Sequence, residues 1–208
     1  MYISRQHNFL FCHVSRTGGT SLTEHIKRHV KDVEQVRLQH LSMKEGKAIL
    51  GEEFDTFFKF TLVRNPWERL VSWYALMALS DASFDLNSAA LNALPDSPHW
   101  RKFDEFLEAV STQKIGGCRG NRLVFSQWQQ LIDDDGNLLV DEIGRFENYA
   151  QDIPKFLSKV NVMKPFEENV NGSKHLHYSE YYSDFGKELV ADVFHEDVSN
   201  FGYHFEPI

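Results

Sequence analysis

A loop of small residues directly follows a short apolar run near the N-terminus. The apolar run is "NFLFCHV" (8–14), and "SRTGGTSL" (15–22) follows it. Glycines let a backbone curl closely around a ligand, and the N–H groups and dipole at a helix start attract anions. A hydroxyl group adds a donor and an arginine adds a planar cation. The sequence therefore predicts an anion-binding turn, and the alternative is a helix that starts with a glycine turn and binds nothing. The turn residues are Arg16, Thr17, Gly18, Gly19, Thr20 and Ser21.

The loop differs from the nucleotide-binding pattern GxxxxGK[ST]. That pattern has a Lys just before its last hydroxyl residue, where the Lys reaches the β- and γ-phosphates. Here the only cation, Arg16, stands at the front of the loop, and no Lys adjoins Thr20. No strand-end carboxylate for Mg²⁺ is evident either. An ATP-dependent kinase of small molecules is thus an alternative that these residues do not favour.

A second pair of polar residues follows the strand-like segment "TFFKFTLV" (56–63). Arg64 comes directly after this segment, and Ser72 lies eight residues further on. Pro66 is well placed to open a helix, which would put Ser72 about two turns into it. A long arginine side chain could then meet Ser72 across a bound group. The alternative is that Arg64 pairs with Glu68 and that Ser72 is an ordinary helix residue.

The elements that must position these residues alternate between strands and helices. We expect strands at 8–14, 33–38 and 56–63, and helices at 20–30 and 42–51. Such alternation predicts an α/β fold with a parallel sheet, whose ligands bind at the carboxyl ends of the strands. Further helices are expected from 66, from 100 and over most of 177–205, and a hairpin turn is expected at "DDDGN" (133–137).

Composition and charge indicate which partners and which cellular compartment to expect. The 208 residues are 42% hydrophobic and 25% charged, as in a globular domain with a sizeable core. A net charge of −8 disfavours nucleic-acid binding. Cys12 and Cys118 are far apart without ligand spacing, which favours a reducing compartment. With no apolar run long enough for a signal peptide or a membrane span, we expect a cytoplasmic protein. The sequence does not indicate its oligomeric state.

Taken together, the two motifs resemble a known enzyme family. "SRTGGTSL" resembles PKTGGTSL, and "VRNPWERLVSWY" resembles VRNPxxRLVSxY, which are motifs of the sulfotransferases that use 3′-phosphoadenosine 5′-phosphosulfate (PAPS). The blocks "GNLLVDEIGRFENY", "GSKHLHYSEYY" and "ELVADVFHEDVSNFGY" follow in the family's order, so the resemblance spans 9–205. It is nearest to the carbohydrate branch that includes heparan 2-O-sulfotransferase-like proteins and bacterial relatives. The family has Pro and Lys where this chain has Ser15 and Arg16.

The resemblance implies a fold, a reaction and a set of binding residues. It implies one three-layer sulfotransferase domain over 1–208, with a P-loop-like turn, PAPS as sulfuryl donor, no metal, and a hydroxyl of a carbohydrate or glycoside as acceptor. The turn at 16–21 would hold the 5′-phosphosulfate. The 3′-phosphate would be held by Arg64 and Ser72, and by Ser173 and Lys174, which match a C-terminal loop that reaches this phosphate in several relatives.

The resemblance also implies a base and an electrostatic catalyst. His40, in "LQHLSMKE", stands where the 2-O branch has the histidine that takes the acceptor's proton. A histidine titrates near neutral pH, which suits this task. Arg16 would stabilise charge on the departing phosphate. His40 could instead be a capping or surface residue, and His13 is interpreted as structural. A nucleotide-binding protein that has lost catalysis and a plain interaction domain are the remaining alternatives.

Overall fold

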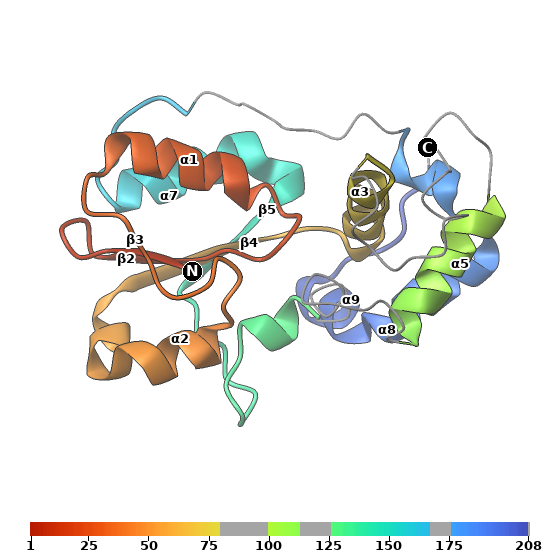
Figure 1. The fold of residues 1–208 in the computed structure, drawn as a ribbon, viewed down its shortest axis with the longest axis horizontal. Coiled ribbons are helices and arrows are strands. Elements are labelled where there is room, and N and C mark those ends of the chain that lie inside the picture. Colours follow the sequence, from red (N-terminus) through yellow and green to blue (C-terminus); the bar gives the residue numbers. More distant parts are fainter. Residues whose placement is uncertain (80–99, 113–125, 167–175, 208) are drawn as a thin grey trace. The chain divides into compact units, whose positions relative to one another are not determined.

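The computed structural model describes residues 1–79, 100–112, 126–166 and 176–207. The chain divides into two compact units (Figure 1). The first unit combines Met1–Arg64 with Gln127–Asn171, and the second combines Asn65–Ser126 with Gly172–Ile208. None of the helices in the described part of the chain is long and apolar enough to cross a membrane.

The first unit is built around a five-stranded sheet with the order β3-β1-β2-β4-β5. Strand β2 pairs in parallel with β4, and β4 pairs in parallel with β5, so this part of the sheet confirms the predicted parallel arrangement. Strand β1 instead runs antiparallel to both β2 and β3. The tight turn at 5–8 explains the pairing with β2, because so short a connection can join only antiparallel strands. The strands are β1 (Tyr2–Ser4), β2 (Phe9–Cys12), β3 (Glu34–Gln35), β4 (Phe58–Val63) and β5 (Glu142–Arg145).

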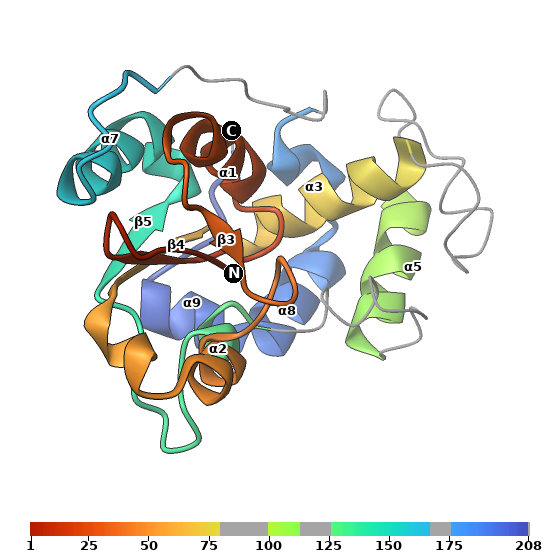
Figure 2. The same ribbon diagram turned by 60° about the vertical axis from the view of Figure 1, so that its left-hand side comes forward.

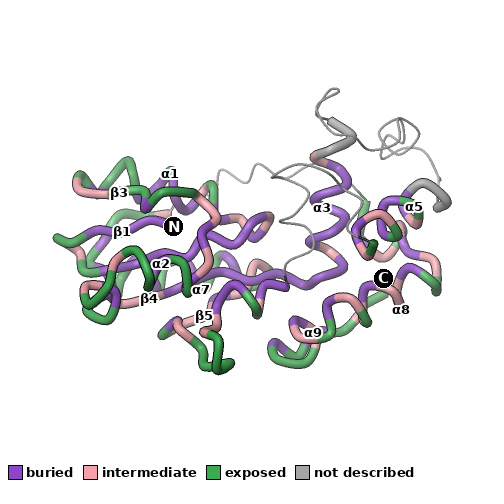
Figure 3. The backbone as a smooth tube through the Cα atoms, turned by 60° about the horizontal axis from the view of Figure 1, so that its bottom comes forward, coloured by how far each residue is buried: buried purple, intermediate pink, exposed green. Residues whose placement is uncertain are grey.

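Helices cover both faces of this sheet (Figures 1 and 2). Helices α1 (Gly19–His29) and α7 (Tyr149–Lys159) lie on one face, and α2 (Met43–Leu50) with the 3-10 helix η1 (Gly51–Thr56) lies on the other. Strand β2 is buried throughout and β4 along most of its length. Figure 3 colours the backbone by this burial and labels β4. The core between the sheet and the first pair of helices includes Phe9, Phe11, Phe60, Leu62, Leu22, Ile26, Ile153 and Phe156.

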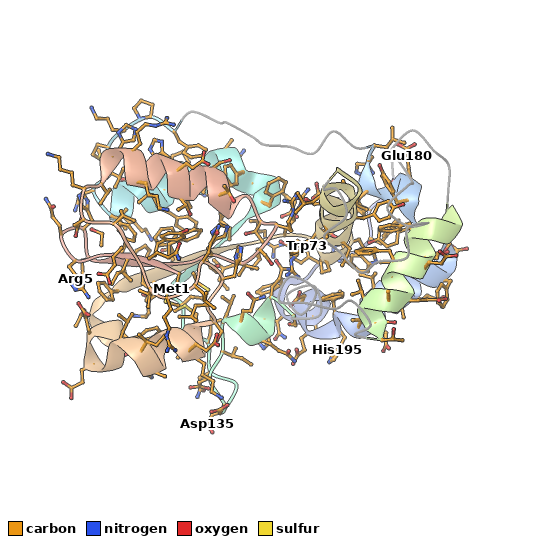
Figure 4. All side chains as sticks on the ribbon, viewed as in Figure 1. Met1, Arg5, Trp73, Asp135, Glu180 and His195 are labelled. Carbon is orange, nitrogen blue, oxygen red and sulfur yellow. The ribbon has the colours of Figure 1, made fainter. Side chains whose placement is uncertain are left out.

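Local sequence signals define several of these elements. Ser42 and Glu45 form a capping box at the start of α2, and Gly51 ends this helix with a φ of 59°. The predicted hairpin turn is present, since Asp133 N–H donates to Asn137 O (3.0 Å) and the backbone bridges Ile132 to Leu138. Figure 4 labels Asp135 at the tip of this turn.

The second unit is helical in its described residues. It contains α3 (Pro66–Leu79), α5 (Trp100–Ser111), the 3-10 helix η4 (Tyr178–Tyr181), α8 (Asp184–Val193) and α9 (His195–Phe201). An aromatic cluster joins α3, α5 and the end of η4, since Tyr74 and Tyr182 both pack edge-on against Phe103. The segment 177–205, predicted to be mostly one amphipathic helix, is mostly helical but is divided into η4, α8 and α9. The backbone of Phe194, at φ −109° and ψ 30°, leaves the helical region and separates α8 from α9.

Candidate active site

The turn between β2 and α1 has the backbone of an anion-binding site. Gly18 adopts a left-handed conformation with a φ of 80° and forms the N-cap of α1 without any side-chain cap. The N-cap residue therefore makes no side-chain bond to the N–H groups of the first helical turn, and no acidic residue lies in that turn. Thr20 is exposed and Ser21 half-buried in this turn. Thr17 is fully buried and donates its hydroxyl proton to Val14 O (2.8 Å), so that proton serves the loop itself.

Two aromatic side chains support the turn from behind. The hydroxyl of Tyr149 donates to the carbonyl oxygen of Gly18 at 2.7 Å. A Cβ atom on Gly18 would lie 2.6 Å from Cε2 of Tyr149 and 3.1 Å from Cδ2 of Phe146. Both the left-handed backbone and this close approach require glycine at the position. The family resemblance of "GRFENY" includes both aromatics, but only the fold shows that they contact the turn.

Arg64 and Arg16 bring two cations to the same edge of the sheet. Arg64 follows β4, the parallel neighbour of β2, so both strands deliver their carboxyl ends to one edge. Its Nη1 donates to Arg16 O at 3.3 Å, and its Cζ lies 3.9 Å from the ring centroid of Phe146. Arg16 itself is half-buried and has a φ of 66°, an uncommon conformation for a residue with a side chain.

A buried glutamine fixes the main chain of Arg64. Gln127 is fully buried, its Oε1 accepts from the N–H of Arg64 at 2.9 Å, and its Nε2 donates to the carbonyl of Arg64 at 2.7 Å. This double contact determines where the Arg64 side chain leaves the strand. Sequence reasoning did not identify Gln127, because nothing in the spacing relates it to a residue 63 positions earlier.

His40 has the tautomer that a base needs. It follows β3 and is half-buried, and its Nδ1 lies 2.8 Å from the carbonyl oxygen of His13. A carbonyl can only accept, so a neutral His40 carries its proton on Nδ1 and its lone pair on Nε2. The two imidazoles contact each other edge to face, with centroids 4.6 Å apart. Burial first, and the nearby His40 second, lower the pKa of His13 well below its usual range, so that His13 stays neutral.

The structure brings most of the predicted site residues together. The turn at 16–21, His40 and Arg64 all belong to the first unit, where contacts with Arg16 and His13 connect them. Ser72 is buried on α3 in the second unit, and its pairing with Arg64 stays a prediction. Ser173 and Lys174 lie outside the described residues.

Comparisons with known proteins agree with this arrangement. The sequence profile of the family described as "Sulfotransferase family" matches residues 1–204. The chain belongs to the sulfotransferase family. An uncharacterized protein of Archaeoglobus fulgidus is 26% identical over 118 residues, which are 57% of this chain and 79% of that protein. Sulfotransferases move a sulfuryl group to a hydroxyl-bearing acceptor and generally use PAPS as the donor, so membership of the family implies a sulfuryl donor and such an acceptor for this chain.

Proposed function

We propose that this sulfotransferase uses PAPS and transfers the sulfuryl group to a hydroxyl of a carbohydrate or small glycoside, as in the heparan 2-O-sulfotransferase-like branch. Both compact units would act together as one domain over 1–208. The observation that carries the proposal is the place of Arg64. Its guanidinium lies over Phe146 and donates to Arg16 O, beside the glycine turn at the start of α1.

The residues of the first unit fit a ligand with two separate anionic groups. The first-turn N–H groups of α1, with Arg16, suit a 5′-phosphosulfate, because an acidic side chain is absent from that turn and the helix dipole favours negative charge there. Arg64 suits the 3′-phosphate, since a guanidinium binds phosphate oxygens with paired donors. Ser72, Ser173 and Lys174 would complete the 3′-phosphate site.

Each predicted catalytic group has a distinct task in the proposed reaction. PAPS supplies the sulfuryl group and leaves as 3′,5′-ADP. His40 accepts the proton of the acceptor hydroxyl at Nε2, while the bond from Nδ1 to His13 O holds the ring in place. Arg16 and the N–H groups of the turn stabilise the negative charge that develops on the phosphate oxygen, and such fixed donors supply much of the catalysis in transfer reactions. No step requires a metal ion.

Ligand-induced stabilisation tests the proposal directly. The thermal midpoint is measured with 3′,5′-ADP and with 5′-ADP, in the presence of EDTA. A ligand at 100 times its Kd adds about 2.7 kcal/mol of stability. We expect a raised midpoint with 3′,5′-ADP and none with 5′-ADP, which lacks the 3′-phosphate. Equal shifts with both nucleotides, or no shift with either, would refute the proposal.

Three variants then assign the roles. Arg64→Ala is expected to weaken 3′,5′-ADP binding by about 2–4 kcal/mol, the scale for a lost charge-assisted contact. The matched control is Arg5→Ala, because Arg5 is an exposed arginine paired with Glu34 and Glu53 beyond the other end of the sheet. His40→Ala should abolish sulfuryl transfer from radiolabelled PAPS and leave 3′,5′-ADP affinity intact. Tight 3′,5′-ADP binding by a wild type that transfers to no acceptor would instead identify a binding protein.

A further inference from the structure

We propose that His13 is a positioning residue for His40, held in that role by Gln39 and Gly19. The inference rests on the proposed function, in which His40 accepts the acceptor's proton. His13 itself is 2% exposed and is placed behind the base rather than among the reacting groups. Its predicted role was only structural, but four contacts of His13 indicate more: two with His40, one with Gln39 and one with Gly19.

Two of these contacts are made with His40. The carbonyl oxygen of His13 accepts the proton on Nδ1 of His40 at 2.8 Å, which directs the Nε2 lone pair away from His13. The ring of His13 meets the ring of His40 at 68° with centroids 4.6 Å apart. Phe11 stacks on the His13 ring with centroids 5.6 Å apart and planes at 25°. Since Phe11 belongs to β2, the His13 ring is fixed to the sheet.

The third contact fixes the His13 tautomer. Nε2 of Gln39 lies 3.1 Å from Nδ1 of His13. An amide nitrogen can only donate, so Nδ1 of His13 accepts and its ring proton is on Nε2. Gln39 immediately precedes His40 in the chain. The bond therefore ties the segment that carries the base to a ring that is itself fixed to the sheet. It requires a neutral His13, which the lowered pKa of this buried side chain supplies.

The fourth contact joins the ring to the anion-binding turn. A Cβ atom on Gly19 would lie 2.3 Å from Cδ2 and 2.5 Å from Nε2 of His13. The first residue of α1 thus touches the ring with no space between them. One imidazole fills the gap between the turn that would hold the sulfuryl donor and the residue that would take the proton. The size of this imidazole sets the distance between the turn and His40, and transfer rates depend steeply on the distance between reacting groups.

The test measures the His40 ring without needing an acceptor. Protein labelled with ¹⁵N in its histidine rings is studied by ¹H–¹⁵N NMR, and the solvent exchange rate of the Nδ1 proton of His40 is recorded. In His13→Phe and in Gln39→Leu, which break the same bond from its two sides, this rate should rise at least tenfold. The double variant should exchange no faster than His13→Phe alone, because that variant already removes the bond that Gln39→Leu breaks.

A control variant tests whether the change in exchange is specific to the contacts of His13. His7→Phe is the matched control: the half-buried His7 has its Nδ1 2.8 Å from Val160 O and precedes the far end of β2. It should leave His40 unchanged. A wild-type His40 with its proton on Nε2, or exchange unchanged within twofold in both single variants, would overturn the inference. Gln39→Leu alters a half-buried side chain, so it remains informative if His13→Phe fails to fold.

Binding and turnover separate this inference from the proposed function. Affinity for 3′,5′-ADP should stay within threefold in Gln39→Leu, while sulfuryl transfer from PAPS should fall about tenfold to a hundredfold through kcat, the scale for a misplaced group. Gly19→Ala keeps its backbone N–H but displaces the His13 ring, so it should raise the exchange rate of His40 as well. A wild type that does not bind 3′,5′-ADP would refute the function, and normal binding with unchanged exchange would refute only the positioning role.

Discussion

Replacement of Gly18 by alanine should damage the first unit more than an equivalent replacement elsewhere. Gly18 has a φ of 80°, and its Cβ would lie 2.6 Å from Tyr149. The matched control is Gly136→Ala, since Gly136 has nearly the same φ of 82° but nothing within 4 Å of its Cβ. The two substitutions therefore share the backbone change and differ in the collision.

Three energetic effects decide the size of this difference. A left-handed backbone disfavours alanine by about 1–2 kcal/mol relative to glycine, and this applies at both positions. The loss of flexibility in the unfolded chain, about 0.4–1 kcal/mol in favour of alanine, is also shared and cancels in the comparison. Overpacking against Tyr149 and Phe146 adds about 1–3 kcal/mol at Gly18 only. Gly18→Ala should thus lower the free energy of unfolding by about 1–3 kcal/mol more than Gly136→Ala.

Urea denaturation followed by far-UV circular dichroism measures this difference. Calorimetric titration with 3′,5′-ADP supplies a second measurement, because the turn shares the Phe146 contact with Arg64. We expect at least a tenfold loss of affinity in Gly18→Ala and none in Gly136→Ala. Equal loss of stability in the two variants would show that packing does not require glycine at the turn. Unchanged affinity in a folded Gly18→Ala would separate the turn from the ligand.

Three further predictions concern neighbouring residues. Phe146→Leu should weaken 3′,5′-ADP binding by about 0.5–2 kcal/mol in calorimetry, because Arg64 loses its cation–π contact, and Phe146→Tyr should restore the affinity. Arg16→Ala and Arg16→Gly should both reduce the rate of sulfuryl transfer by about 10²–10³-fold. In thermal unfolding the glycine variant should be more stable than the alanine variant by about 1–2 kcal/mol, because the φ of Arg16 is 66°. Equal stabilities of the two variants would contradict this. His13 has a lowered pKa in the folded state, so the unfolded state binds more protons below its ordinary pKa of about 6.5. Stability should therefore fall as the pH drops below about 6.5, and His13→Phe should flatten that part of the urea-midpoint profile.

Much of the first unit follows from local sequence signals. The apolar runs correctly predict β2 and β4, and the Ser42–Glu45 spacing correctly predicts the start of α2. The prediction of parallel pairing is confirmed for β2, β4 and β5 but misses the hairpin of β1. Strand β1 has only three residues, too few for a periodic signal. The C-terminal helices share one amphipathic pattern, so their separation at Phe194 was not predicted.

The sequence alone determined the turn and its family, because a strand, a glycine turn and a helix lie within some twenty consecutive residues and fold by local preferences. It also placed Arg64 at a strand end and His40 after the edge strand. Only the tertiary structure decided what holds these groups. The bond between Tyr149 and Gly18 joins residues 131 positions apart. The contact of Gly19 with His13 depends on how α1 packs on the sheet. Such contacts arise from the packing of whole elements, which no local spacing encodes.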